Sequence, residues 1–267
     1  IDVLTALYFD IMNINKNNFD NDNRDRFILS KGHSSLALYT ILFLKGLLSE
    51  EELQTFRKNG SNLWGHIDLK TPGIEMSTGS LGHGLSVGVG RALSAKIDNK
   101  NYNVFVMMGD GETQEGSIWE AAMSAAHYEL DNLVGIVDRN KIQQCGFTED
   151  ILGLGNYKDK WEAFGWDVRE IDGHNMDEIY KSFKSISYID KKPSLVISNT
   201  IKGKGVSFME NDNNWHGGGA ISEYSDMAPP PCQLLSFSIN ETPLPFIVLL
   251  ITKEGFLSIY EILLKDL

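Results

Sequence analysis

Short apolar segments alternate with helical segments through the middle of this 267-residue chain, and this alternation limits the possible folds more than any other feature. The apolar segments have strand length, and the segments between them have helical caps or helical periodicity. Apolar strands separated by helices build a parallel sheet that is buried on both faces. The sequence therefore predicts an α/β fold, a doubly wound parallel sheet with helices on both faces. The predicted strands are 103–108, 132–138, 167–171 and 194–200, and the predicted helices are 117–130, 159–166 and 175–186.

Local signals predict how several helices begin. Ser49 and Glu52 predict a capping box, and residues 79–97 predict a Gly-rich loop that runs into a helix of small residues. Ser117 and Glu120 predict a second capping box at the start of the helix 117–130. The stripe of that helix that we expect to be buried consists of Trp119, Ala122, Met123 and Ala126.

The composition changes near Gly219. The segment that follows contains five of the seven prolines and has no clear period. We therefore expect one folded domain over residues 1–219, and we treat 220–267 as a divergent tail of uncertain structure.

Charge and hydropathy exclude several classes of partner. The formal net charge is −12, which argues against nucleic acid, because phosphate binding needs clustered Lys and Arg. The late apolar run at 246–251 is far too short to span a bilayer. The two cysteines, Cys145 and Cys232, show no CxxC pattern, and residues 1–10 lack the features of a signal peptide. We expect a cytoplasmic protein with neither a membrane nor a nucleic-acid partner.

Glycines between a predicted strand and a predicted helix usually leave room for a phosphate. In Gly109-Asp110-Gly111, however, an acidic residue lies between the two glycines. Asn140 follows 30 residues later, after the next predicted strand. Parallel strands joined by a crossover helix end at the same edge of the sheet, so both side chains are expected there. Carboxylate and amide oxygens suit a hard cation such as Mg²⁺, which takes further ligands from phosphates. The pattern favours a diphosphate that is bound through a metal, near the N-terminus of the following helix.

Two other interpretations of this stretch stay open. It superficially resembles the dinucleotide fingerprint GxGxxG, but Gln114 stands where the third glycine belongs. The second alternative is a tight turn in which Asp110 only caps the next helix, although the matched Asn140 weakens this interpretation.

Longer motifs carry a closer resemblance to a known family. They lie in the segments 25–39, 65–90, 109–143, 161–174, 200–210 and 215–217. With these segments in order along residues 1–217, the chain resembles the N-terminal part of transketolase, and most closely the separately encoded N-terminal subunit of split transketolases. This resemblance implies a thiamine diphosphate-binding fold, with residues 1–219 as the domain that binds the diphosphate.

The resemblance implies a set of cofactor residues. Asp110, Asn140 and the carbonyl of Ile142 would hold Mg²⁺, or Ca²⁺ or Mn²⁺ in its place. Gly111 would contact the diphosphate. The residues that would line the aminopyrimidine side are Gly79 and Leu81.

The resemblance also implies residues for the reaction. His33 would lie by the diphosphate and the reacting carbon, and His66 and His216 would reach the ketose substrate. Neutral imidazoles can move protons near pH 7, as ketol transfer requires. Glu115 would join a carboxylate network that links paired active sites.

The implied activity is ketol (glycolaldehyde) transfer between sugar phosphates in the pentose phosphate pathway. Thiamine diphosphate enzymes also need a glutamate on a pyrimidine-binding domain, and no region of this chain resembles that domain. We therefore expect a partner, the C-terminal transketolase subunit, in a heterotetramer. Two alternatives remain: the α subunit of a 2-oxo-acid dehydrogenase, and an inactive cofactor-binding remnant.

Three departures from the family pattern bear on these expectations. The chain starts just after the position of the segment with which the family usually opens. Asn199 stands where the family often has Lys, near the cofactor. After residue 217 the resemblance is lost.

Overall fold

The computed structural model describes residues 1–15 and 17–216. The chain divides into two compact units, Ile1–Thr200 and a second unit that begins at Ile201. The predicted tail 220–267 and its boundary with the domain 1–219 lie outside the described residues, so that division stays a prediction. None of the helices in the described part combines the length and the apolar character needed to cross a membrane.

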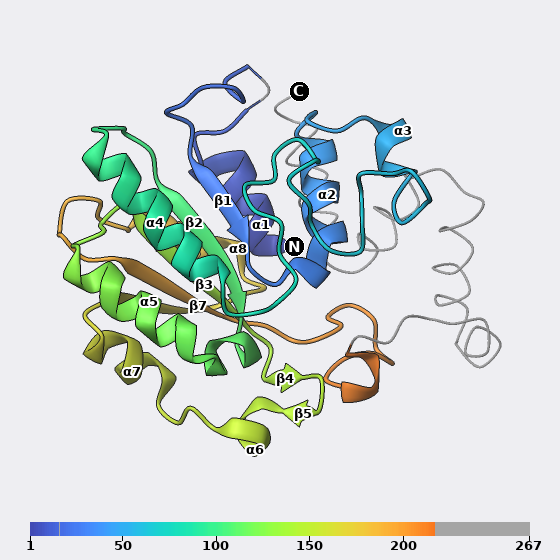
Figure 1. The fold of residues 1–267 in the computed structure, drawn as a ribbon. Coiled ribbons are helices and arrows are strands. Elements are labelled where there is room, and N and C mark those ends of the chain that lie inside the picture. Colours follow the sequence, from blue (N-terminus) through green and yellow to red (C-terminus); the bar gives the residue numbers. More distant parts are fainter. Residues whose placement is uncertain (16, 217–267) are drawn as a thin grey trace. The chain divides into compact units, whose positions relative to one another are not determined.

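A five-stranded, fully parallel sheet forms the centre of the first unit, in the order β1-β2-β3-β7-β6 (Figure 1). All four strands predicted from the sequence are present. The first strand was not predicted, because it is only four residues long and begins with a charged residue. The strands are β1 (Arg26–Leu29), β2 (Val104–Gly109), β3 (Leu133–Arg139), β6 (Asp167–Asp172) and β7 (Ser194–Asn199).

The strand order explains why helices cover both faces of the sheet. From β1 through β2 and β3 to β6 the chain moves across the sheet in one direction, so right-handed crossovers place α4, α5 and α7 on one face. The step from β6 back to β7 runs the other way and places α8 on the opposite face, where it contacts α1 (Figure 1). This is the predicted doubly wound arrangement. The five helices are α1 (Asp2–Ala6), α4 (Gly84–Ile97), α5 (Gly116–His127), α7 (Tyr157–Ala163) and α8 (Met176–Lys184).

Five further α-helices and strands belong to the described part of the chain. The capping box of Ser49 and Glu52 is present at the start of α3, which confirms that prediction. A two-stranded antiparallel ribbon follows β3. These elements are α2 (Ser35–Leu44), α3 (Glu50–Leu53), β4 (Ile142–Gln143), β5 (Gly146–Phe147) and α6 (Thr148–Leu152).

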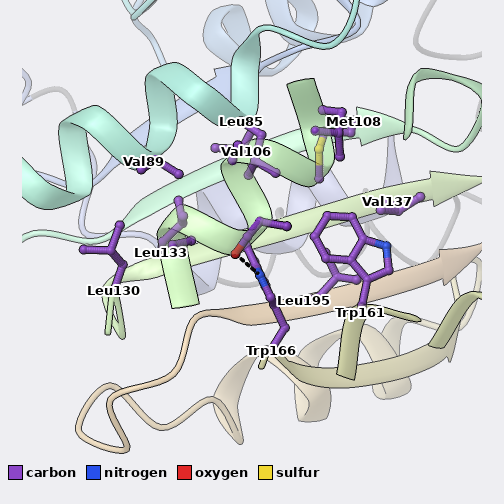
Figure 2. Packing of buried hydrophobic residues seen from close by; sticks show 14 of the residues in the cluster. Leu85, Val89, Val106, Met108, Leu130, Leu133, Val137, Trp161, Trp166 and Leu195 are labelled. Carbon is purple, nitrogen blue, oxygen red and sulfur yellow. Dashed lines mark hydrogen bonds between the residues drawn. The ribbon is translucent and has the colours of Figure 1, made fainter. Parts of the chain in front are cut away.

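The apolar core between the sheet and the helices α4, α5 and α7 holds the unit together (Figure 2). Trp161 of α7 is completely buried there. Trp166 donates a hydrogen bond from its indole N–H to the carbonyl of Ala122, 3.1 Å away, so a large ring is buried without an unsatisfied donor. Burial of each large apolar side chain contributes about 1.5–3 kcal/mol, and this packing fixes the strands whose ends build the candidate site.

The start of α5 differs from the sequence prediction. Its N-cap is Glu115, without a side-chain hydrogen bond, so the predicted capping box of Ser117 and Glu120 is wrong. The Ser117 hydroxyl instead donates to the carbonyl of Gly82, 2.7 Å away, because the preceding Gly-rich loop offers a tertiary acceptor.

The predicted stripe of α5 is also only partly correct. Met123 is 55% exposed, whereas Trp119 is half-buried and contacts the ring of Trp161 at a centroid distance of 5.0 Å. The fully packed positions of this helix are Ile118, Ala121, Ala122 and Ala125.

Candidate active site

The loops after β2 and β3 meet at the carboxyl edge of the sheet. Gly109 is paired in register with Asp138, so Asp110 and Asn140 follow neighbouring strand ends. The backbone N–H of Lys141 donates to Asp110 Oδ2 at 2.6 Å, and the N–H of Gly111 donates to Asp110 Oδ1 at 2.9 Å. The two loops therefore lie together as the parallel-sheet geometry requires. Asp110 caps the short 3-10 turn Gly111–Gln114, and not the helix α5.

The electrostatic environment of Asp110 favours a cation. The residue is 6% exposed, and burial raises the pKa of its carboxyl group to about 6. The N–H groups of Gly111 and Lys141 oppose this rise, and the nearby charge of Asp138 adds to it. A buried carboxylate with a raised pKa gains most from a compensating positive charge, and a divalent ion provides one.

A lysine at the end of β1 brings a positive charge to the same edge. Lys31 forms an ion pair with Asp138, and Thr200 donates from its hydroxyl to the other Asp138 oxygen at 2.5 Å. Burial alone would raise the pKa of Asp138, but Lys31 and the Thr200 hydroxyl outweigh burial and hold this pKa at about 2. The loops after β1 and β7 are thus joined to the end of β3 around one ionised carboxylate.

The donor set at this edge fits a hard cation that carries a diphosphate. Asp110 and Asn140 offer oxygen atoms, and Asn140 Oδ1 accepts one hydrogen bond, from the N–H of Ile142 at 2.9 Å. Within residues 1–15 and 17–216 there is no group of three or more His, Cys, Asp or Glu that could hold a metal, so the missing ligands would come from carbonyl, water or phosphate oxygens.

Gln143 of the ribbon β4–β5 lies against Gly111. Gln143 Oε1 is buried and has no hydrogen-bond partner among the described residues. A Cβ at Gly111 would lie 3.0 Å from Gln143 Cβ, so no larger residue fits there without a shift. A ligand or water donor at this point would satisfy the orphaned oxygen.

The Gly-rich loop before α4 is tied to the same edge. Gly79 is exposed and Leu81 is half-buried. The Thr78 hydroxyl donates to the carbonyl of Leu29 at 3.0 Å, which anchors the loop to the end of β1. Gly82 has a φ of +82°, and a Cβ there would lie 2.8 Å from Glu115 Cβ, so glycine is required on both counts.

Two of the three candidate histidines lie close together. His33 follows β1 and His66 lies in the loop after α3; both are exposed, and their ring centroids are 6.5 Å apart. The loop with His66 is held against α2 because the Ser35 hydroxyl donates to the carbonyl of Gly65 at 3.0 Å. The structure therefore presents two imidazoles side by side, next to the loop that carries Lys31.

The roles of the other two candidates for the reaction, His216 and Glu115, stay predictions. His216 belongs to the second unit, where it follows the 3-10 turn Asn213–Trp215, so its reach to a substrate stays a prediction. Glu115 is exposed at the N-cap of α5 and contacts the Gly-rich loop at Gly82. Its role in linking paired sites also stays a prediction.

The sequence reasoning missed three charged residues at this edge: Lys31, Glu112 and Asp138. Lys31 and Asp138 are 107 positions apart, and no local pattern connects them. The available signal was that Lys31 and Asp138 lie at or just beyond the ends of strands, where ligands of parallel sheets bind. Glu112 gave no such signal, because acidic residues near a helix start are common.

Comparison with protein families and curated proteins identifies relatives of this chain. The family model described as "Transketolase, thiamine diphosphate binding domain" matches residues 1–225. The chain is 52% identical over 228 residues to an apulose-4-phosphate transketolase subunit of Phocaeicola vulgatus, covering 85% of this chain and 81% of that protein. It is 48% identical over 210 residues to a 6-deoxy-6-sulfo-D-fructose transketolase subunit of a Clostridium species, covering 78% of this chain and 76% of that protein.

The solved structures that superpose on this chain include transketolases. The transketolase of Campylobacter jejuni superposes with a TM-score of 0.76 at 30% identity, covering 97% of this chain and 44% of that chain. The Pichia stipitis transketolase in complex with sedoheptulose 7-phosphate superposes with a TM-score of 0.75 at 32% identity, covering 80% and 33%. This chain thus spans less than half the length of these solved enzymes.

Proposed function

The chain belongs to the transketolase family and carries that family's thiamine diphosphate-binding domain, and we propose that it is the diphosphate-binding subunit of a two-chain transketolase. The observation that carries the proposal is the junction of Asp110 with the Asn140–Ile142 loop at the carboxyl edge of the sheet. Mg²⁺, or Ca²⁺ or Mn²⁺, would be held by Asp110, Asn140 and the carbonyl of Ile142.

The cofactor would lie along this edge. Gly111 allows the diphosphate to approach the backbone, and Gly79 and Leu81 would line the aminopyrimidine side. Lys31 brings a positive charge beside the metal site, where it is paired with Asp138. When bound, thiamine diphosphate supplies the electron sink for breaking and forming the C–C bond, so the protein needs no nucleophilic side chain.

The histidines would serve the substrate. His33 and His66 are exposed and adjacent, so they can donate hydrogen bonds to sugar hydroxyls and carry protons as an alkoxide forms and is discharged. His216 would act with them. We propose that the substrate is a ketose with a terminal anionic group, since one relative is named for a sugar phosphate and another for a sulfonated sugar.

The proposed partner is the C-terminal transketolase subunit with the pyrimidine-binding domain, which would supply the activating glutamate. Several relatives are named as single subunits of transketolases, which supports a two-chain enzyme. We propose a cytoplasmic heterotetramer in which Glu115 links paired sites. The family match favours ketol transfer over 2-oxo-acid oxidation. Whether the sugars are those of the pentose phosphate pathway depends on the donor and acceptor that the complex accepts.

The test is reconstitution. The purified chain is mixed with thiamine diphosphate, Mg²⁺, a ketose phosphate and an aldose phosphate, with and without a co-purified partner subunit. Ketol transfer is expected only with the partner. Sustained transfer by this chain alone would contradict the two-chain proposal, and no transfer by the assembled complex would favour an inactive remnant.

A further inference from the structure

A buried glutamate lies between the two loops of the proposed cofactor site. Glu112 is 2% exposed and occupies the second position of the 3-10 turn Gly111–Gln114. The proposed reaction gives it no part, and it lies too deep to contact a substrate. A carboxylate removed from water costs several kcal/mol unless donors surround it, so its partners indicate what it does.

Both carboxylate oxygens of Glu112 accept hydrogen bonds from other segments. Oε1 accepts from the N–H of Gly82 at 2.9 Å and from the Ser30 hydroxyl. Oε2 accepts from the N–H of Gly109 at 3.1 Å. The three donors belong to the Gly-rich loop, the end of β1 and the end of β2, so one side chain joins three segments of the carboxyl edge.

The contact with Ser30 extends to the start of α4. The N–H of Gly84, the first residue of α4, donates to Ser30 Oγ at 3.0 Å, so the Ser30 hydroxyl hydrogen is free to point at Glu112. Ser30 is 1% exposed, and a Cβ at Gly84 would clash with Ser30 Oγ, so the two segments are in direct contact.

These bonds fix the residues on either side of the cofactor site. The hydrogen bond from Gly82 orients the peptide that links it to Leu81, which is proposed to line the aminopyrimidine side. The hydrogen bond from Gly109 orients the peptide that links Met108 to Gly109, one residue before Asp110, the proposed metal ligand. Residues that orient the ligands of a metal typically change its affinity about 10–100-fold when they are replaced.

We propose that Glu112 is a positioning residue that locks the aminopyrimidine-side loop to the metal-binding loop, so that both ends of thiamine diphosphate meet a preformed site. The inference rests on the proposed function. It predicts that replacing Glu112 weakens binding of the whole cofactor more than binding of its diphosphate end alone, because only the whole cofactor contacts both loops.

Glu112→Gln is the informative change, because it keeps the shape and removes one of the two acceptors. The NH₂ group of the new glutamine side chain must then face either the N–H of Gly109 or the two donors at the Oε1 position. In both orientations one donor faces another donor, and a hydrogen bond is lost. Asp25→Asn is the matched control. Asp25 is a carboxylate of 4% exposure that accepts from the N–H groups of Asn13 and Asn103, and it precedes β1 at the opposite edge of the sheet.

The experiment is calorimetric titration of the full chain, assembled with its partner subunit, in excess Mg²⁺. Thiamine diphosphate and inorganic pyrophosphate are titrated separately, at a temperature where circular dichroism shows every variant folded. We expect Glu112→Gln to weaken thiamine diphosphate binding about tenfold or more, and pyrophosphate binding by a smaller factor. We expect Asp25→Asn to change neither.

Each other outcome has a defined meaning. Wild-type affinity for both probes in Glu112→Gln, or an equal loss for both, would overturn the positioning role. An equal loss in Asp25→Asn would overturn it too. If Glu112→Gln does not fold, Ser30→Ala replaces it, since this change removes one of the three donors to Glu112. We then expect a smaller loss of thiamine diphosphate affinity, and no loss would overturn the proposal. A wild type that does not bind thiamine diphosphate with Mg²⁺ overturns the proposed function and this inference with it.

Discussion

Lys31 and Asp138 form an ion pair that joins the loop after β1 to the end of β3. The side chains are only 13% and 27% exposed, so water screens the pair weakly. If the Lys31 ammonium group is removed, Asp138 loses the positive charge that faces it. Asp138 then keeps the hydrogen bond from the Thr200 hydroxyl.

We predict that Lys31→Met lowers the free energy of unfolding by about 1–3 kcal/mol, because it leaves a poorly solvated carboxylate without its cation. The measurement is urea unfolding at pH 7 without metal. The double variant with Asp138→Asn should lose less stability than the sum of the two single losses, by about 0.5 kcal/mol or more. Additive effects would show that the ion pair contributes nothing to stability.

Two glycines of α4 provide a matched test of the packing on β2. A Cβ at Gly88 would lie 2.5 Å from Val106 Cγ2, whereas a Cβ at Gly90 would meet nothing within 4 Å. Alanine in a helix interior is favoured over glycine by about 1 kcal/mol. Gly90→Ala should therefore raise the midpoint of thermal unfolding, and Gly88→Ala should lower it, because the Val106 side chain or the helix must shift. Equal shifts of both variants would contradict the packing of α4 on β2.

Asp25 predicts a pH dependence of stability. Burial raises the pKa of its carboxyl group, and the N–H groups of Asn103 and Asn13 oppose the rise. The folded state therefore binds this proton more tightly than the unfolded state, whose Asp has a pKa of about 3.9. Between that value and the higher folded-state pKa, stability contributed by Asp25 falls as pH rises.

The check is urea unfolding of the wild type and Asp25→Asn at intervals from pH 4 to pH 7. The wild type should lose stability relative to the variant as pH rises from 4, and the difference should then become constant. A wild type that gains stability relative to Asp25→Asn over this range would show that the two backbone donors outweigh burial.

The parallel sheet and the junction of Asp110 with the Asn140 loop could be predicted because both follow from local pattern and strand geometry. Apolar strand segments fix the sheet, and the carboxyl ends of adjacent parallel strands must meet. The bonds of Glu112 could not be predicted, since Ser30 lies 82 positions away and only the folded chain brings them together. For the same reason Ser117 lost its predicted capping role to a contact with Gly82.

Periodicity alone also misplaced the inner face of α5. A helix that begins at Gly116 and packs through small residues against α4 turns Met123 to the surface, and the sequence does not show which neighbour the helix meets. β1 was missed because four residues are too few for a two-residue alternation to be seen.

The most direct test of this account is the Mg²⁺ dependence of cofactor binding. Thiamine diphosphate is titrated into the assembled complex of wild type and of Asp110→Ala, each with Mg²⁺ and with EDTA, and heat is measured. Asp98→Ala, which removes an exposed acid at the end of α4, controls for the change in net charge. We predict tight binding by the wild type and by Asp98→Ala only with Mg²⁺, and none by Asp110→Ala. Unchanged binding by Asp110→Ala, or wild-type binding that persists in EDTA, would contradict the metal site.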